Sequence, residues 1–195
     1  MVGAANSEVF VHPLGLCEST DVGAGTRVWA FAHVLDGASV GNDCNICDHA
    51  YVEQGVTVGD RVTIKNRVLL FEGVTVQDDV FLGPGVIFTN DLRPRAFVKR
   101  GGSELSATLV ERGATLGAGV VVVCGISIGA YAFVGAGTVL TRDVPAHAFV
   151  VGNPGRPIGW ACECGSRLPA ELACPCGRRY HLDGAELTRA TEATA

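Results

Sequence analysis

One feature of the chain constrains its fold above all others: apolar residues recur at every sixth position. Counting in sixes from Phe10 to Phe88 gives fourteen positions, and every one of them is Val, Ile, Leu or Phe. A period of six fits neither an α-helix, with its 3.6 residues per turn, nor the two-residue alternation of hairpins. It is typical of a solenoid of short strands, in which each inward side chain stacks on its counterpart in the next coil.

A second row of small or β-branched residues lies four positions after the first. It consists of Thr26, Ala32, Ala38, Cys44, Ala50, Val56, Val62, Val68, Val74, Val80 and Val86. Such side chains suit the interior of short strands, so both rows are expected to face inward. Glycine often follows a first-row residue, and we expect tight corners there because glycine lacks a Cβ. These glycines are Gly23, Gly41, Gly59 and Gly83.

The six-residue pattern stops after Phe88 and resumes at Val110, displaced by four positions. A loop is therefore predicted at about residues 91–108. It carries a group of cations: Arg93, Arg95, Lys99 and Arg100. Long loops on a regular scaffold are often functional, so we expect a site here; the alternative is a solvated basic excursion.

Composition limits the classes of protein to which the chain can belong. Its 195 residues suit one main domain with a small appendage. A net charge of −5 argues against a general nucleic-acid binder, which usually carries a basic face. We find no secretory signal and no run of about 18 apolar residues, so we expect a cytoplasmic protein without membrane insertion.

The chain resembles the left-handed β-helix, hexapeptide-repeat acyltransferases. The resemblance lies in repeats such as VGAGTR, VGNDCN, VGDRVT, LGAGVV, IGAYAF and VGAGTV, and in the ending TRDVPAHAFVVGNPGRPIG. It covers roughly residues 10–160 and implies an all-β, left-handed parallel β-helix in a domain of residues 1–160. It also implies a homotrimer, with acetyl-CoA bound in the groove between neighbouring coils.

The expected coenzyme A contacts lie near the end of the repeats. Guanidinium groups suit phosphate oxygens, so Arg142 and Arg156 are candidates for the phosphates. The alternative is that VGNPGRP is only a chain exit with an exposed arginine. Residues with little side-chain bulk would let the pantetheine arm lie flat; they are Gly117, Ala118, Gly135 and Ala136.

Residues 69–97 resemble a narrower group, the nucleotide-linked 3-amino-sugar N-acetyltransferases, which includes enzymes acting on UDP-2-acetamido-3-amino-2,3-dideoxyglucuronate. The FTN motif of this group is intact and ends at Asn90, whereas its YEGV motif appears as FEGV, with Phe71 in place of tyrosine. The resemblance implies acetyl transfer from acetyl-CoA to the amine of a UDP- or dTDP-linked amino sugar. It also implies that Asn90 positions this amine, since its amide hydrogen-bonds but takes no proton.

The reaction needs an uncharged amine beside a thioester and an outlet for one proton. No histidine lies between His49 and His147, so the central coils carry no histidine base, and proximity alone is expected to supply much of the rate. Asp91 is a candidate proton acceptor or a turn cap. Glu72 is a candidate contact for sugar hydroxyls or the amine, or an exposed corner residue. The other candidate substrate contacts are Phe71, Arg93, Arg95, Lys65 and Asn66.

A cysteine-rich segment follows the repeats, at residues 161–184. Its two Cys-x-Cys-Gly knuckles place four thiols within a short span: Cys162, Cys164, Cys174 and Cys176. Four thiolates give tetrahedral zinc coordination, so a structural Zn²⁺ that caps the solenoid is expected, with reduced thiols and disulfides as alternatives. Residues 185–195 are predicted to be a disordered tail.

Three other functions compete with N-acetylation. A carbonic anhydrase on this fold needs three histidines for zinc, which the histidine gap disfavours. A non-catalytic scaffold would not be stabilised by acetyl-CoA. An O-acetyltransferase acting on a sugar or small molecule is the main alternative, but a hydroxyl acceptor depends more on a base than an amine does.

Overall fold

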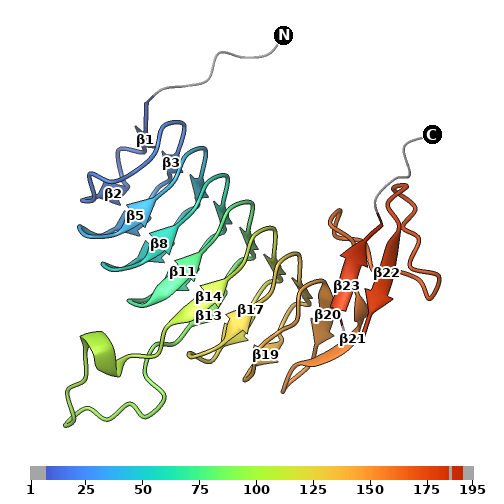
Figure 1. Ribbon diagram of the computed structural model, residues 1–195. Helices are drawn as coiled ribbons and strands as arrows, with labels where there is room; N and C mark the ends of the chain where they lie inside the picture. Colours follow the sequence, from blue (N-terminus) through green and yellow to red (C-terminus); the bar gives the residue numbers. More distant parts are fainter. Residues whose placement is uncertain (1–7, 185, 191–195) are drawn as a thin grey trace.

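The computed structural model describes residues 8–184 and 186–190. These residues form a parallel β-solenoid, whose coils contribute strands to three long sheets that run along the molecule (Figure 1). Paired strands of successive coils lie 18 positions apart, as in the pairs Asn45↔Thr63 and Thr63↔Phe81. One coil therefore holds three six-residue repeats, which confirms the predicted solenoid.

From β3 to β19, every third strand along the chain joins the same sheet. The nine-stranded sheet contains β1 (Phe10–Val11), β3 (Arg27–Val28), β6 (Asn45–Ile46), β9 (Thr63–Ile64), β12 (Phe81–Leu82), β15 (Thr115–Leu116), β18 (Phe133–Val134), β20 (Ala148–Val151) and β21 (Arg156–Trp160). The seven-stranded sheet contains β2 (Leu16–Cys17), β4 (His33–Val34), β7 (Tyr51–Val52), β10 (Leu69–Leu70), β13 (Ile87–Phe88), β16 (Val121–Val122) and β19 (Val139–Leu140). The five-stranded sheet contains β5 (Ser39–Val40), β8 (Thr57–Val58), β11 (Val74–Val76), β14 (Thr108–Val110) and β17 (Ser127–Ile128).

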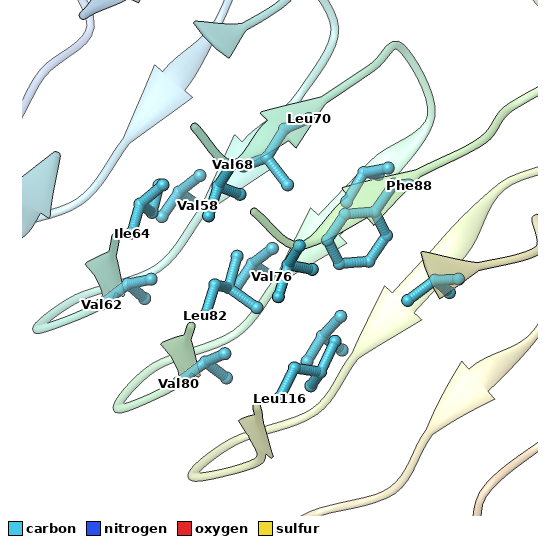
Figure 2. Packing of buried hydrophobic residues seen from close by; sticks show 14 of the residues in the cluster. Val58, Val62, Ile64, Val68, Leu70, Val76, Val80, Leu82, Phe88 and Leu116 are labelled. Atoms are coloured by element: carbon cyan, nitrogen blue, oxygen red, sulfur yellow. The ribbon is translucent and has the colours of Figure 1, made fainter. Parts of the chain in front are cut away.

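The core consists of columns of identical positions in successive coils. Ile64, Leu82 and Leu116 occupy one such column, with no exposed surface, and lie one beyond another in Figure 2. The second row is buried as well, including Cys44 and the polar Thr26. The Thr26 hydroxyl donates to the Gly41 carbonyl at 2.8 Å and accepts the Cys44 N–H at 3.0 Å, so its burial leaves no polar group unsatisfied.

The corners differ from the prediction in one respect. From Gly25 to Gly137, a residue with positive φ precedes each second-row residue, and this residue is often not glycine, as at Phe31 (60°). The left-handed turn therefore lies two positions after the glycines at which tight corners were predicted. Those glycines allow close packing between coils instead, since a Cβ added to Gly41 would lie 2.6 Å from the Gly59 carbonyl carbon.

The first coil also departs from the six-residue count. Its strands pair 17 positions away, so that Val11 and Cys17 align with the inward Val28 and Val34. The prediction that Phe10 and Leu16 face inward is wrong, because they align with Arg27 and His33, which are not first-row residues. The physical reason is that the segment from Cys17 to Val22 is one residue short of a full repeat.

Two segments leave the solenoid. The first lies between β13 and β14, contains a short 3₁₀ helix, η1 (Gly102–Glu104), and projects from one side of the molecule in green in Figure 1. The second follows β21 and ends in a hairpin of β22 (Tyr180–Asp183) and β23 (Glu186–Arg189). Residues 186–189 form β23 in the structure, where a disordered tail was predicted, while residues 185 and 191–195 of that tail lie outside the described residues. No helix in the described residues is long and apolar enough to span a membrane.

Candidate functional site

The segment between β13 and β14 borders a cavity of about 540 Å³. Before this segment, paired strands lie 18 positions apart, as in Thr57↔Thr75. Strands that pair across the segment lie 34 positions apart, as in Val74↔Thr108, so the segment adds 16 residues to one coil. We call residues 91–106 the excursion loop. The backbone N–H of Ser106 donates to the Asn90 carbonyl at 2.9 Å, so the loop leaves and rejoins the coil at nearly the same point.

Asp91 and Arg100 hold the excursion loop together. One Asp91 oxygen accepts the Arg93 backbone N–H at 2.7 Å, and the other accepts the Arg100 guanidinium at 3.3 Å. Arg100 also donates to the Arg93 carbonyl at 2.6 Å. Because both Asp91 oxygens are engaged, the geometry favours the turn-capping alternative for this residue over the role of proton acceptor.

Three of the predicted acceptor-site residues besides Asp91 line the cavity: Glu72, Asn90 and Arg95. Glu72 comes from the corner after β10, Asn90 from the end of β13, and Arg95 from the loop. The structure thus brings together the end of the FTN motif, the FEGV glutamate and one loop arginine. These residues offer an amide, a carboxylate and a guanidinium to one molecule.

The other predicted acceptor-site residues lie elsewhere. Arg93 is exposed and outside the cavity lining, and Phe71 packs with its ring centroid 6.0 Å from that of Tyr51. Lys65 is also outside the lining, whereas Asn66 borders a different hollow of about 370 Å³ together with His49. The structure therefore does not place Lys65 and Asn66 with Asn90.

Sequence reasoning assigned no role at this site to Glu53, Lys99 or Arg100, which all line the cavity. The two cations belong to the basic stretch that marked the loop. Glu53 lies 19 positions before Glu72, about one coil length, and that spacing was the signal that could have found it. Neither His33 nor His49 lines this cavity; His33 Nε2 lies 3.2 Å from a Glu18 oxygen.

The residues expected to contact coenzyme A form a strip of small side chains on successive coils. A Cβ added to Gly117 would lie 2.6 Å from the Ala136 nitrogen, so the two corners pack directly on each other. The N–H groups of Gly117 and Gly135 are used within the coils, at 2.8 Å from the Val134 and Val150 carbonyls. Those of Ala118 and Ala136 have no hydrogen-bond partner within residues 8–184 and 186–190, so they are the available donors of the strip.

The two arginines predicted for coenzyme A lie at the last coil. Arg142 borders a small apolar hollow together with Leu140 and Pro157. Arg156, at the start of β21, is exposed, and its guanidinium donates to the Gly155 carbonyl at 2.9 Å. Both residues are exposed, and Gly155 and Pro157, the neighbours of Arg156, border the same hollow as Arg142.

The four tail cysteines converge on one point. Their sulfur atoms all lie within 4.8 Å of one another, with Cys162–Cys176 at 3.6 Å and Cys164–Cys174 at 3.5 Å. Zinc–sulfur bonds of about 2.3 Å would set the sulfurs of a tetrahedron about 3.8 Å apart, so the donor set fits Zn²⁺. The expected zinc ligands thus have suitable geometry.

Neighbouring groups lower the pKa of two cysteines of this cluster, while desolvation and hydrogen bonds with the neighbouring thiols raise the pKa of Cys174. Hydrogen bonds from the Arg178 backbone N–H and from its guanidinium lower the pKa of Cys176 to about 6. The Ser166 hydroxyl and backbone N–H lower the pKa of Cys164. The Tyr180 hydroxyl lies 3.2 Å from the Cys162 sulfur, and its ring packs against His147 in the last coil. The cluster is therefore tied to the end of the solenoid.

Comparison with known proteins agrees with this architecture. The family described as the hexapeptide repeat of succinyl-transferase matches residues 37–72 and 107–142, on either side of the excursion loop. The chain is 48% identical over 187 residues to the dTDP-3-amino-3,6-dideoxy-alpha-D-galactopyranose 3-N-acetyltransferase of Aneurinibacillus thermoaerophilus. That match covers 94% of this chain and 96% of the relative.

Solved structures give the same fold. A hexapeptide-repeat-containing acetyltransferase from Vibrio cholerae O1 biovar eltor, in complex with acetyl coenzyme A, aligns with a TM-score of 0.53 and 25% identity, covering 64% of this chain and 70% of that chain. A variant of AntD, an N-acyltransferase from Bacillus cereus in complex with dTDP and coenzyme A, aligns with a TM-score of 0.59 and 17% identity, covering 78% and 80%. The second likeness supports the fold alone.

The repeat family brackets the loop, and the amino-sugar acetyltransferase matches almost from end to end, across the loop and into the cysteine-rich tail. This chain therefore belongs to the left-handed β-helix, hexapeptide-repeat acetyltransferases, within the group that N-acetylates nucleotide-linked amino sugars.

Proposed function

We propose that the protein transfers the acetyl group of acetyl-CoA to the 3-amino group of a dTDP-linked amino sugar. One observation carries the choice of substrate: the 48% identity to a dTDP-3-amino-sugar 3-N-acetyltransferase, which extends over 94% of this chain. The cavity suits such a substrate, because its lining holds cations for a diphosphate and carboxylates for an amine. A UDP-linked 3-amino sugar is the neighbouring possibility that the assay below tests.

The chemistry is an aminolysis of a thioester. The ammonium group first loses a proton, and the neutral amine then attacks the thioester carbonyl carbon. A C–N bond forms as the C–S bond breaks, and the coenzyme A thiolate departs with the second amine proton. Binding both substrates side by side supplies much of the rate, since a bimolecular step becomes effectively unimolecular.

We assign Asn90 to orient the amine through its side-chain amide. Glu72 lies in the same cavity and is the carboxylate that takes the first proton. Asp91, whose oxygens are engaged by Arg93 and Arg100, shapes the loop in this proposal. The cations Arg95 and Lys99 face the diphosphate, Arg100 holds the loop through Asp91, and Arg93 lies at the outer surface.

On the donor side, we assign the pantetheine arm to the strip of small residues from Gly117 to Ala136. The N–H groups of Ala118 and Ala136 donate to its amide carbonyls, while Arg142 and Arg156 bind the phosphates of coenzyme A. The homotrimer and the cytoplasmic location also belong to this proposal. So does a structural Zn²⁺ on Cys162, Cys164, Cys174 and Cys176, which would fix the tail and supply no step of the reaction.

A thiol-release assay with acetyl-CoA tests the proposal. The acceptors are dTDP- and UDP-linked sugars with an amine at C3 or C4, and matched sugars with a hydroxyl at the same carbon. We expect the highest kcat/KM with the dTDP-linked 3-amino sugar. Turnover with hydroxyl acceptors and with none of the amines would replace the proposal by O-acetylation.

The Asn90→Ala variant tests the assigned role of Asn90. We expect turnover to fall by about 10²-fold, because the amine loses its orienting hydrogen bond. The thermal midpoint and the oligomeric state should stay as in the wild type. Unchanged kinetics would remove Asn90 from the mechanism.

A further inference from the structure

Three residues of the solenoid make the same corner contact. Each follows a first-row residue and accepts a backbone N–H from the next coil: Glu53 from Glu72 at 2.8 Å, Gln77 from Arg112 at 3.0 Å, and Glu111 from Ala130 at 2.9 Å. In Gln77 the acceptor is a neutral amide oxygen. The contact therefore needs an oxygen at this position and does not need a negative charge.

Of these three residues, only Glu53 lines the cavity under the excursion loop. Its oxygen Oε2 holds the backbone of Glu72, which lines the same cavity. The Glu72 side chain rests on the preceding coil, where its Cγ lies 3.2 Å from a Cβ added to Gly55. Glu53 therefore fixes the corner that carries Glu72 and also contributes a second carboxylate to the cavity.

The negative charge of Glu53 has no ion-pair partner in residues 8–184 and 186–190. Arg100, which lines the same cavity, pairs with Asp91 instead. A carboxylate that faces a cavity and forms no ion pair within the protein attracts a cationic ligand to its own wall. The solenoid wall of the cavity is thus acidic at Glu53 and Glu72, and the loop wall is basic.

We infer that Glu53 is a substrate-binding and positioning residue: it attracts the ammonium form of the acceptor amine and holds Glu72 in place. This inference rests on the proposed function, because a nucleotide-linked amino sugar carries an ammonium group at one end and a diphosphate at the other. The two walls then orient it in one direction, with the amine toward the solenoid and the nucleotide toward the loop.

The test compares Glu53→Gln with Glu111→Gln, a matched control that makes the same corner contact outside the cavity. Both variants keep an oxygen acceptor, as Gln77 does, so both should retain the wild-type thermal midpoint. For Glu53→Gln we expect the KM of the amino sugar to rise about tenfold, the size of one lost charge-assisted hydrogen bond, with kcat within about twofold. Glu111→Gln should keep the wild-type KM and kcat.

A pH series adds a readout that a purely structural role would not move. The wild-type KM should rise as pH increases and the amine loses its proton, whereas the KM of Glu53→Gln should depend less on pH. Glu53→Ala and Glu111→Ala should lower the thermal midpoint similarly, since each removes the corner acceptor.

The outcomes separate the inference from the proposed function. Wild-type turnover of an amino sugar with an unchanged KM in Glu53→Gln overturns the inference and leaves the function standing. An equal rise of KM in Glu111→Gln also overturns the inference, since the effect would then come from the solenoid. Absence of wild-type turnover with every amino sugar overturns both.

Discussion

The coils of the solenoid and the excursion loop place opposite demands on their residues. In the coils, first-row and second-row side chains such as Leu82 and Val86 have no exposed surface, so packing decides their identity. In the loop, Phe97 is 84% exposed, and nearly every side chain from Leu92 to Lys99 faces solvent. Packing places few demands on this loop, so we attribute Arg95 and Lys99, which line the cavity, to ligand binding. One region specifies the fold, and the other is free to specify the substrate.

Removing the loop is the strongest test of this division. Deletion of residues 91–106 joins Asn90 to Ala107 and restores the 18-residue spacing, because the loop ends already meet at Asn90 and Ser106. We expect a folded solenoid whose turnover is lower by about 10³-fold or more, since the acceptor is no longer held. Circular dichroism and the thiol-release assay measure the two properties. An unfolded product would mean that the loop also specifies the fold.

A core truncation should show the opposite behaviour. Leu82→Ala leaves a cavity in the stacked column and is expected to cost about 2 to 5 kcal/mol of unfolding free energy. Turnover per folded molecule should stay near the wild-type value at low temperature. Urea denaturation gives the free energy, and a loss below about 1 kcal/mol would show that neighbouring coils relax into the space.

The tail provides a pH-dependent test. The pKa of Cys176 is lowered from 9.0 to about 6, so its thiolate is present at pH 7 to 8 and is lost as pH falls through about 6. We expect bound zinc to be retained at pH 8 and released at about pH 5, because zinc ligands must be deprotonated. Metal analysis after dialysis measures this. Cys176→Ser should bind less zinc at every pH, and a wild-type protein without metal at pH 8 would contradict the zinc proposal.

The smallest effect is expected at the first coil. Leu16→Ser replaces a side chain that is 50% exposed, so it should change the unfolding free energy by about 0.5 kcal/mol or less. Cys17, which aligns with the inward Val34, is the matched position for comparison. If Leu16→Ser lowered the unfolding free energy as much as Leu82→Ala, Leu16 would face inward after all, as counting in sixes predicted.

The fold could be predicted from sequence because a solenoid repeats one local rule. Each buried position occurs many times, so a single exception hardly changes the pattern. The first coil shows the limit of this rule. One of its repeats is one residue short, so Val11 and Cys17 align with the inward row instead of Phe10 and Leu16. The sequence could not show this shift, because the residues of both pairs are apolar. The corners show another limit, since Phe31 and His49 adopt a left-handed conformation that glycine was expected to take.

The candidate site was harder to predict, because its residues come from three coils and a loop. The basic stretch marked the loop, and Asn90 stood where the pattern stopped. Lys65 and Asn66 were also predicted as substrate contacts, yet neither lines the cavity. Glu53 was missed because its position in the repeat is also occupied by structural residues such as Glu111, and in the sequence only its spacing of 19 positions from Glu72 distinguishes it.

The final strand of the nine-stranded sheet, β21, has a consequence for association between copies. A parallel solenoid can in principle grow by adding one coil after another, and the open edge of its last coil is a template for a further chain. Here β21 lies antiparallel to β20 and closes that edge from within the same chain. Pro157, which pairs with Val150, has no N–H to offer a further strand. At the C-terminal end of this sheet, β21 therefore blocks the end-to-end addition of further copies into a fibre.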